Sequence, residues 1–331
     1  MDQPRVTIVC VPRDHFSDVR ESLESIFANT PEPFDLVYVD GGSPAPIARY
    51  LSEQAAQHRF RLIRTEHYLS PNRARNLGAA SVTSPYMVFI DNDVVVAPEW
   101  LPPLVACADR TDAAVVSPLN FEQRPLHTIV HFAGGKAHVD VVEKDGRSER
   151  HIVDKIIKKH FPKESAPTEC AEFHCMLVRT DAFRAVGGLD ERLLSTRENL
   201  DFCMALREAG HQVWFEPASR ITYLPPMEMR LVDVPFFALR WSDEWDMASF
   251  RHFQAKWRLA DDAYFAREYR NLGWRRRNLM MRAGLLGWLP SWKLRIAAER
   301  VLRPLERRIN RTISARYAAR HLRAEGRRRG A

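Results

Sequence analysis

The chain has 331 residues, of which 45% are hydrophobic and 27% are charged. These values are ordinary for a soluble globular protein with room for a sizeable core. No stretch approaches the roughly 20 apolar residues that a membrane-spanning helix needs. The five cysteines are scattered and odd in number, which argues against a disulfide framework and favours reduced thiols in a cytoplasmic protein.

The charge is unevenly distributed along the chain. Residues 271–331 hold 17 Lys and Arg against 3 Asp and Glu, so this tail carries +14 and the preceding 270 residues carry −7. Any argument for an anionic partner therefore concerns the tail. No recognised nucleic-acid module accompanies the basic residues, so we expect no nucleic-acid partner.

The first third of the chain alternates strands and helices. Apolar runs predict strands over residues 6–11, 36–39, 60–63, 86–90 and 113–117, and helical spacing predicts helices over 18–28, 47–57, 72–81 and 100–108. Single helices between strands indicate an α/β fold with a mostly parallel central sheet flanked by helices. Such sheets bind ligands at the carboxyl ends of their strands. We therefore expect Asp40 and Asp91, which follow the second and fourth strands, to face one crevice.

The remainder of the chain is less regular. We interpret residues 120–168 as an excursion from the sheet that includes a Lys-rich helix over 152–160. Strands are expected over 173–178 and 213–215, and helices over 181–186, 197–209 and 234–257. The last of these helices is rich in aromatic residues, which indicates core packing more than a sugar-binding platform, although Arg240 to Asp243 would suit a sugar acceptor.

The clearest chemical feature is the sequence Asp91-Asn92-Asp93. Two short carboxylates separated by one residue, directly after an apolar strand, can reach one hard cation together with the oxygens of a diphosphate. Such a cation acts as a Lewis acid for a leaving nucleoside diphosphate. An isolated pattern of this kind is more often a solvated turn, but the preceding strand and the upstream Asp40 favour a metal-diphosphate site.

Six segments together resemble family 2 of the glycosyltransferases. They are residues 6–12, V-Y-V-D-G-G-S at 37–43, N-R-A-R-N-L-G at 72–78, residues 86–93, G-G-L-D-E at 187–191, and R-E-N-L-D-F from 197 on to Gly210. The resemblance covers roughly residues 5–225. It implies a Rossmann-like GT-A fold, a nucleotide-sugar donor, Mn²⁺ or Mg²⁺ as cofactor, and usually inversion at the anomeric carbon. We expect a catalytic domain over residues 1–230 and a helical C-terminal region over 231–331 with a basic amphipathic tail.

The resemblance also implies roles for individual residues. Asp40 corresponds to the acidic residue that hydrogen-bonds the nucleobase, unless it only shapes its Gly-Gly turn. The remaining nucleotide-sugar contacts are expected from Pro12, Arg13, Arg73, Arg75, Asn76, Asp91 and Asn92, and the metal ligands are expected to be Asp91 and Asp93. Arginine suits bidentate contacts to oxygen, although Arg73 would equally fit the solvated face of a helix.

The catalytic base is harder to assign. Family members commonly show E-D-x-D where this chain has Glu198-Asn199-Leu200-Asp201, and Asn199 cannot accept a proton. Glu198 is therefore the first candidate to deprotonate an acceptor hydroxyl, and Asp201 is the second. Alternatively, Ser195 to Glu198 fits a capping box, in which the glutamate closes the start of a helix. The asparagine also resembles G-E-N segments of retaining families, which leaves inversion open.

A second departure from the family pattern lies at Tyr223, where related sequences often have a histidine that completes the metal site. His174 and His131 are possible substitutes, although each is more often a structural histidine. These departures keep a catalytically degenerate glycan- or membrane-binding protein as an alternative. A nucleotidyltransferase is another, but the residues after the first strand lack the glycine-rich loop that it would need.

The basic tail supports two interpretations. Tryptophans followed by an apolar stripe in an Arg-rich helical segment suit an anionic membrane surface, and would place the protein peripherally on the cytoplasmic face. The alternative is a helical hairpin packed on the catalytic domain with a solvated Arg face. Pro304 is expected to kink or restart this helix. The leading hypothesis for the whole chain is glycosyl transfer from a nucleoside-diphosphate sugar to a glycan, lipid-linked or small-molecule acceptor.

Overall fold

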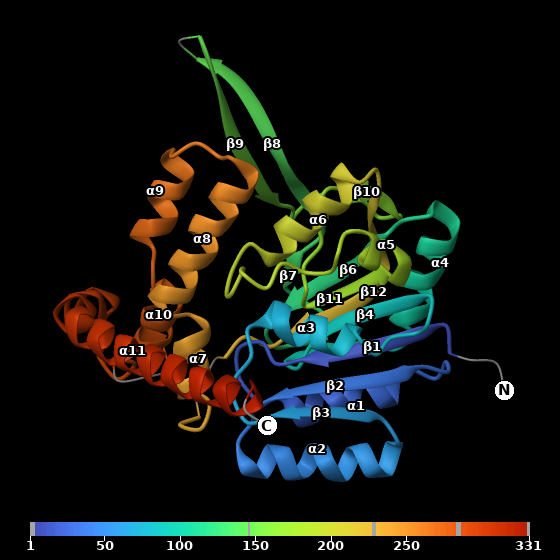
Figure 1. Ribbon diagram of the computed structural model, residues 1–331, viewed down its shortest axis with the longest axis horizontal. Coiled ribbons are helices and arrows are strands. Elements are labelled where there is room, and N and C mark those ends of the chain that lie inside the picture. Colours follow the sequence, from blue (N-terminus) through green and yellow to red (C-terminus); the bar gives the residue numbers. More distant parts are fainter. Residues whose placement is uncertain (1–3, 145, 227–229, 283–285, 330–331) are drawn as a thin grey trace.

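The computed structural model describes residues 4–144, 146–226, 230–282 and 286–329. A central sheet is flanked by helices, a two-stranded hairpin projects beyond the body, and the C-terminal helices gather at one end of the sheet (Figure 1). The arrowheads of β1 (Val6–Val11) and β2 (Asp35–Gly41) point toward this end. The C-terminal region therefore lies where the carboxyl ends of the parallel strands meet.

The main sheet has the strand order β10-β12-β6-β11-β4-β1-β2-β3, with β5 paired to β12 and β7 paired to β6. The strands from β4 to β3 are parallel, as expected, whereas β11 is antiparallel to both β4 and β6. The remaining strands are β3 (Arg61–Thr65), β4 (Tyr86–Asp91), β5 (Val94–Val96), β6 (Val115–Glu122), β7 (Val130–Phe132), β8 (Gly135–Lys144), β9 (Arg147–Ile156), β10 (Ala166–Thr168), β11 (Cys175–Arg179) and β12 (Val213–Tyr223).

Helices cover both faces of this sheet. On β4, Phe89 belongs to one hydrophobic cluster, with α3 and α6, and its neighbour Val88 belongs to the other, with α1 and α4. A strand buried on both faces reads as a continuous apolar run, which explains why these strands were predictable. The helices are α1 (Val19–Asn29), α2 (Ala45–His58), α3 (Pro71–Ala79), α4 (Leu101–Thr111), α5 (Thr180–Ala185), α6 (Glu198–Glu208), α7 (Val234–Arg240), α8 (Asp243–Trp257), α9 (Ala263–Arg270), α10 (Trp274–Arg282) and α11 (Trp292–Arg329).

The predicted Lys-rich helix over 152–160 is wrong. Residues up to Ile156 belong to β9, which pairs antiparallel with β8 along its whole length. Ile152 is buried on the base of this hairpin, so cross-strand pairing and packing override a weak helical pattern. The strand predicted over 213–215 is likewise too short, because β12 continues to Tyr223 through a bulge between Glu216 and Arg220.

The aromatic segment over 234–257 forms two helices instead of one. The chain turns at Trp241, and Ser242 caps the second helix by accepting a hydrogen bond from the amide of Trp245 at 3.2 Å. A serine at this position is a helix-start signal that competes with continuous helical spacing. The expected core role of the aromatic side chains is confirmed, since Phe236, Phe237, Trp241, Trp245, Phe250, Phe253 and Trp257 are all buried.

The C-terminal helix α11 packs with its polar side facing the protein. Glu299 and Asn310 are buried against the body, while an apolar stripe of Leu294, Val301, Leu305 and Ile309 is exposed; Val301 is 78% exposed and Glu299 is 5% exposed. The predicted restart of this helix at Pro304 is wrong, because α11 continues through the proline. A helix that buries charge and exposes aliphatic side chains reverses the usual arrangement of a globular protein.

Candidate active site

The end of β4 places Asp91 and Asp93 beside His174. Asp91 is the last residue of β4, and His174 immediately precedes the antiparallel strand β11, where its carbonyl accepts a hydrogen bond from the amide of Asp91 at 3.2 Å. One ligand atom from each of Asp91, Asp93 and His174 lies within 4.8 Å of the others, and all three residues are buried. The group therefore has the spacing of a site for one cation.

Asp91 is an ionised carboxylate held by two arginines. Arg75 donates a hydrogen bond to its Oδ1 at 2.8 Å, and the Nε of Arg13 lies 3.4 Å from its Oδ2. Burial alone would raise the pKa of Asp91, but Arg13 and Arg75 outweigh burial and lower this pKa to about 2. The charge on Asp91 is thus stabilised by the protein itself.

The surroundings of Asp93 differ from those of Asp91, because no arginine binds its carboxyl group among the described residues. Its side chain is fully buried, and among the described residues neither carboxylate oxygen has a hydrogen-bond partner. Its nearest basic group is His15, whose Nδ1 lies 3.8 Å from Oδ2. Burial raises the pKa of Asp93 well above its usual range. Because a buried carboxylate without partners is costly, Asp93 fits a residue whose natural partner is a cation.

Asn92 connects the two loops at the carboxyl edge of the sheet. Its Oδ1 accepts from the amide of Arg13 at 2.9 Å, and its Nδ2 donates to the carbonyl of His15 at 2.8 Å. Pro12 lies in the same loop, packed against Gly41, where an added Cβ would approach the proline ring to 3.1 Å. Asn92 therefore holds the loop after β1 in place, and its amide is already occupied by backbone groups.

Arg75 projects from α3 into the interior beneath Asp91. It is fully buried, its guanidinium lies 4.0 Å from the ring centroid of Phe173, and its pKa is lowered by burial. Within the described part of the chain, its Nε and Nη1 have no hydrogen-bond partner. These two N–H groups next to the carboxylate pair could donate hydrogen bonds to phosphate oxygens.

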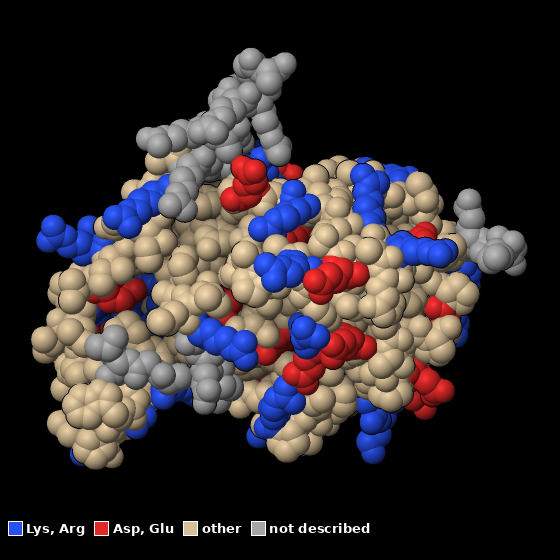
Figure 2. Space-filling view, turned by 90° about the horizontal axis from the view of Figure 1, so that it is seen from below, with Lys and Arg blue, Asp and Glu red and all other residues tan. Residues whose placement is uncertain are grey.

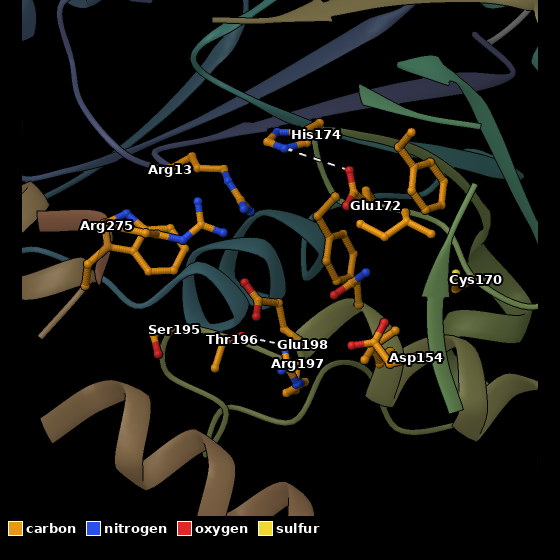
Figure 3. Close-up of a pocket in the computed structure, with 16 residues that line it drawn as sticks. Arg13, Asp154, Cys170, Glu172, His174, Ser195, Thr196, Arg197, Glu198 and Arg275 are labelled. Atoms are coloured by element: carbon orange, nitrogen blue, oxygen red, sulfur yellow. Dashed lines mark hydrogen bonds and ion pairs between the residues drawn. The ribbon is translucent and has the colours of Figure 1, made fainter. Parts of the chain in front are cut away.

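A polar cavity of about 180 Å³ adjoins these residues. Arg13 and His174, which both lie against Asp91, form part of its wall, so the carboxylate pair stands directly behind that wall. Figure 3 shows Arg13 and Arg275 approaching the cavity from one side, with Glu172 and Glu198 facing it from the right and from below. With Arg197 and Asp154, which also line it, the cavity has three arginines and three carboxylates in its wall.

Glu198 lines the cavity, whereas Asp201, one turn later on α6, does not. Glu198 accepts a hydrogen bond at 3.1 Å from Arg240, which is itself fully buried. Both oxygens of Asp201 are bound to α8, by Lys256 Nζ at 2.7 Å and Trp257 Nε1 at 2.8 Å. The geometry therefore favours Glu198 over Asp201 as the residue that meets a substrate.

The capping-box interpretation of Glu198 is wrong. The residue before α6 is Arg197, at φ 69°, and it receives no side-chain cap hydrogen bond. The hydroxyl of Ser195 instead donates to Asp246 at 2.6 Å. The pattern matched a capping box by sequence alone, but α8 supplies the partner of the serine.

Of the eight predicted nucleotide contacts, Arg13 belongs to the cavity lining and the other seven do not, and three of those seven are engaged elsewhere. Asp40 accepts hydrogen bonds from Ser43 and Arg64 beside its own turn. Asn76 binds the backbone of Leu189 through both ends of its amide, at 3.0 and 2.8 Å, and thereby joins α3 to the loop before α6. Arg73 faces a separate hollow that it shares with Thr65, His67, Leu69 and Leu77.

Tyr223, which replaces the expected histidine, packs against both candidate substitutes. Its ring is stacked on His174, with centroids 4.0 Å apart, and lies 5.8 Å from His131. Its hydroxyl donates to Asp14 at 2.8 Å. His174, which the sequence named as a possible substitute, is the imidazole beside the aspartates.

Several residues of the cavity were not identified from the sequence as site residues. Arg275 comes from the start of α10, and its guanidinium lies over the ring of Trp241, 4.0 Å from the ring centroid. Trp241 itself donates to Asp14 at 3.1 Å. The signal of Arg275 in the sequence was weak, because it is one of many arginines in the tail and its position depends on how α10 packs. Trp241, in contrast, falls in the segment 240–243 that the sequence marked as suited to a sugar acceptor.

A central sheet of this kind, with a carboxylate pair at the end of β4, is the arrangement of the GT-A glycosyltransferases. Residues 6–187, more than half of the chain, match the family described as Glycosyl transferase family 2, so the chain belongs to this family. The fold is similar to that of GalNAc-T7, solved with UDP, GalNAc and Mn²⁺. The TM-score is 0.53 at 16% identity, over 81% of this chain and 57% of that one.

Curated proteins of similar sequence include a Pre-mycofactocin glycosyltransferase of Mycobacterium tuberculosis, 26% identical over 66% of this chain and 42% of that protein. An uncharacterized protein, y4gI, of Sinorhizobium fredii is 25% identical over 79% of this chain and 29% of that protein. The chain thus spans less than half the length of these curated relatives.

Proposed function

We propose that this family 2 glycosyltransferase moves a sugar from a nucleoside-diphosphate sugar to an acceptor hydroxyl during glycan, polysaccharide or glycolipid synthesis. The observation that carries the proposal is the buried carboxyl group of Asp93 beside Asp91, which has no hydrogen-bond partner among the described residues and lies directly behind a cavity that Glu198 faces. A cation and a diphosphate would satisfy Asp93 and the free nitrogens of Arg75 at once.

In this proposal, one set of residues binds the donor and its cation, and another residue accepts the proton of the acceptor. Asp91 and Asp93 would hold Mn²⁺ or Mg²⁺, which when bound supplies Lewis acidity toward the departing diphosphate. Arg13 and Arg275 face the same cavity and can neutralise phosphate oxygens. Glu198 accepts the proton of the acceptor hydroxyl at a carboxylate oxygen, and Arg240 holds that carboxylate in place. A base that faces the donor across the cavity supports an inverting transfer.

Calorimetric titration with UDP and GDP, with and without Mn²⁺, tests the donor half of the proposal. We expect binding of at least one nucleotide, weakened by a chelator. The absence of binding to either nucleotide would favour a degenerate, non-catalytic protein, which the departures at Asn199 and Tyr223 would then explain. Screening nucleotide sugars for hydrolysis identifies the donor, and the same screen with added acceptors separates transfer from hydrolysis.

We further propose that α11 binds an anionic membrane surface, on the cytoplasmic face. No helix in the described part of the chain combines the length and hydropathy of a membrane span. The exposed stripe of Leu294, Val301, Leu305 and Ile309 nevertheless lies on a helix that carries many arginines. In Figure 2, several Lys and Arg side chains stand at the left end of the molecule among a mostly uncharged surface. Exposed aliphatic side chains surrounded by cationic ones match a lipid interface.

Liposome flotation tests this surface directly. The variant Val301→Asp places a charge in the centre of the stripe without disturbing a buried contact. We expect it to float with anionic vesicles far less than the unmodified chain, and Val142→Asp, which alters an exposed valine of the hairpin, serves as the matched control. Equal flotation of all three proteins would contradict the membrane proposal and leave α11 as a packed helix with a solvated face.

A further inference from the structure

A second group of metal-binding side chains lies on the cavity wall, and the transfer reaction proposed above does not use it. His131 of β7, Glu172, and His174 next to β11 each offer a ligand atom, and these atoms lie within 4.8 Å of one another. The Nε2 of His131 is 3.2 Å from Oε2 of Glu172, and the Nε2 of His174 is 4.0 Å from the same oxygen. Both imidazoles therefore present the same nitrogen to one carboxylate.

The other nitrogen of each imidazole faces a carboxylate of its own. The Nδ1 of His131 lies 2.8 Å from Oε2 of Glu122, and the Nδ1 of His174 lies 3.3 Å from Oδ2 of Asp91. A carboxylate behind each histidine is the arrangement that orients metal-binding imidazoles in proteins, because it fixes the tautomer and leaves Nε2 free to coordinate.

We propose that His131, Glu172 and His174 bind a transition-metal ion, of the class of Zn²⁺ or Co²⁺, distinct from the cation of Asp91 and Asp93. A tetrahedral ion with bonds of about 2.1 Å holds its ligands roughly 3.4 Å apart, so the observed spacings need little adjustment. Two imidazoles and one carboxylate favour this class over Mg²⁺, which prefers oxygen ligands. His174 stands between the two sites, with Nδ1 toward Asp91 and Nε2 toward Glu172.

The fourth position of this ion faces the cavity. Glu172 and His174 belong to the cavity lining, and Figure 3 shows them across the cavity from Glu198 and Arg197. Sites with three protein ligands and one open position bind water or a substrate oxygen. The ion would thus hold an oxygen of the ligand opposite the proposed base and help to orient it.

Cobalt titration separates this site from the donor site. Chelator-treated protein is titrated with Co²⁺ without nucleotide, and visible absorption and calorimetry are followed. We expect Asp93→Asn, which removes a carboxylate of the first site alone, to bind one equivalent of Co²⁺. Added to Asp93→Asn, His131→Gln and Glu172→Gln should each weaken this Co²⁺ binding at least about tenfold.

The matched control is His151→Gln. His151 also lies between two carboxylates, Asp262 at 2.7 Å and Glu149 at 3.4 Å. It belongs to neither of the two metal-binding groups found among the described residues. Its Co²⁺ binding should match that of the unmodified chain. Circular dichroism of every variant establishes that each is folded, and two independent ligand variants keep the test informative if one of them fails to fold.

Two results would overturn the proposal. If Asp93→Asn binds no Co²⁺, or if adding His131→Gln or Glu172→Gln to it leaves Co²⁺ binding unchanged, the cluster is a charged His131 held between two glutamates. The donor site is judged separately by UDP titration with Mn²⁺, which His131→Gln should leave unchanged. Loss of nucleotide binding with intact Co²⁺ binding would refute the donor proposal alone.

Discussion

The two sides of the cavity are built in different ways. The side of Asp91, Asp93 and Arg75 belongs to the ends of neighbouring elements of the sheet domain, whose register brings the residues together. The side of Arg240 and Arg275 belongs to helices more than 140 residues further along the chain, held by ion pairs and packing. Changes on the first side should therefore affect chemistry most, and changes on the second should affect attachment and positioning.

The largest effect is expected at Asp93. Replacing it with alanine should lower glycosyl transfer roughly 100- to 1,000-fold, because the cation contributes several kcal/mol to the transition state. Steady-state assays with the identified donor over a range of Mn²⁺ measure this effect. Activity equal to that of the unmodified chain, or activity insensitive to a chelator, would refute the metal role.

The two aspartates can also be compared without any substrate, through the stability of Asp93→Asn and Asp91→Asn. In metal-free protein, Asp93→Asn should be as stable as the unmodified chain or more so, because it replaces a buried carboxyl group that has no hydrogen-bond partner among the described residues. Asp91→Asn should be less stable, because it leaves Arg75 and Arg13 without their carboxylate. Equal loss of stability in both variants would show that the two aspartates do not differ as described.

The next largest effect on activity is expected at Glu198, and Asp201 on the same helix provides the comparison. Glu198→Gln should reduce kcat roughly 100-fold or more while donor binding persists, because it removes a base that faces the cavity. Asp201→Asn should act mainly on stability, through its bonds to Lys256 and Trp257. Steady-state assays measure kcat and KM of each variant, and thermal unfolding measures its stability. A larger loss of kcat in Asp201→Asn would reverse our assignment of the base.

The attachment of the C-terminal region is tested at Arg276. This buried guanidinium binds Glu306 at 2.6 Å, Asp243 at 2.8 Å and the carbonyl of Trp241. Arg276→Met removes the ion pair of Glu306 and the closer of the two ion pairs of Asp243, whose other partner is Arg307 at 3.7 Å, and should destabilise the fold by about 3 kcal/mol. Urea unfolding and the rate of proteolysis of α11 check this. The control is Arg303→Met, whose half-exposed pair with Glu299 should contribute about 0.5 kcal/mol or less.

The smallest effect depends on pH. Asp190 links the loop before α6 to α8, with His252 Nε2 at 2.7 Å and Lys256 Nζ at 3.2 Å. Burial would raise the pKa of Asp190, but these partners lower it. Asp190 therefore stabilises the fold fully above the unfolded-state pKa of about 3.9, and this stabilisation is lost as pH falls through the lower pKa of the folded state. Asp190→Asn should be about 1 kcal/mol less stable at pH 7 and nearly equal at pH 3, by urea unfolding. Asp261→Asn, an exposed position, should show no such dependence.

The strands of the sheet were predictable because both of their faces are buried, so Val6–Val11 and Tyr86–Asp91 read as unbroken apolar runs. The hairpin was not, because the half-exposed strand Arg147–Ile156 carries many charges and owes its conformation to pairing with β8. The break before α8 was missed for a different reason, since the signal of Ser242 was present but was outweighed by continuous aromatic spacing. The independence of residues 1–230 and 231–331 stays a prediction, although Phe236 and Phe253 share core clusters with the sheet.

The sequence alone determined the family, the strand ends and the Asp91-Asn92-Asp93 segment, because these depend on local patterns and on spacing along the chain. The tertiary structure decided which side chains meet there. It paired Glu198 with Arg240, separated Asp201 and Asp40 from the cavity, and brought His131 and Glu172 to His174. Such contacts join residues far apart in sequence, and only the packing of whole elements determines them.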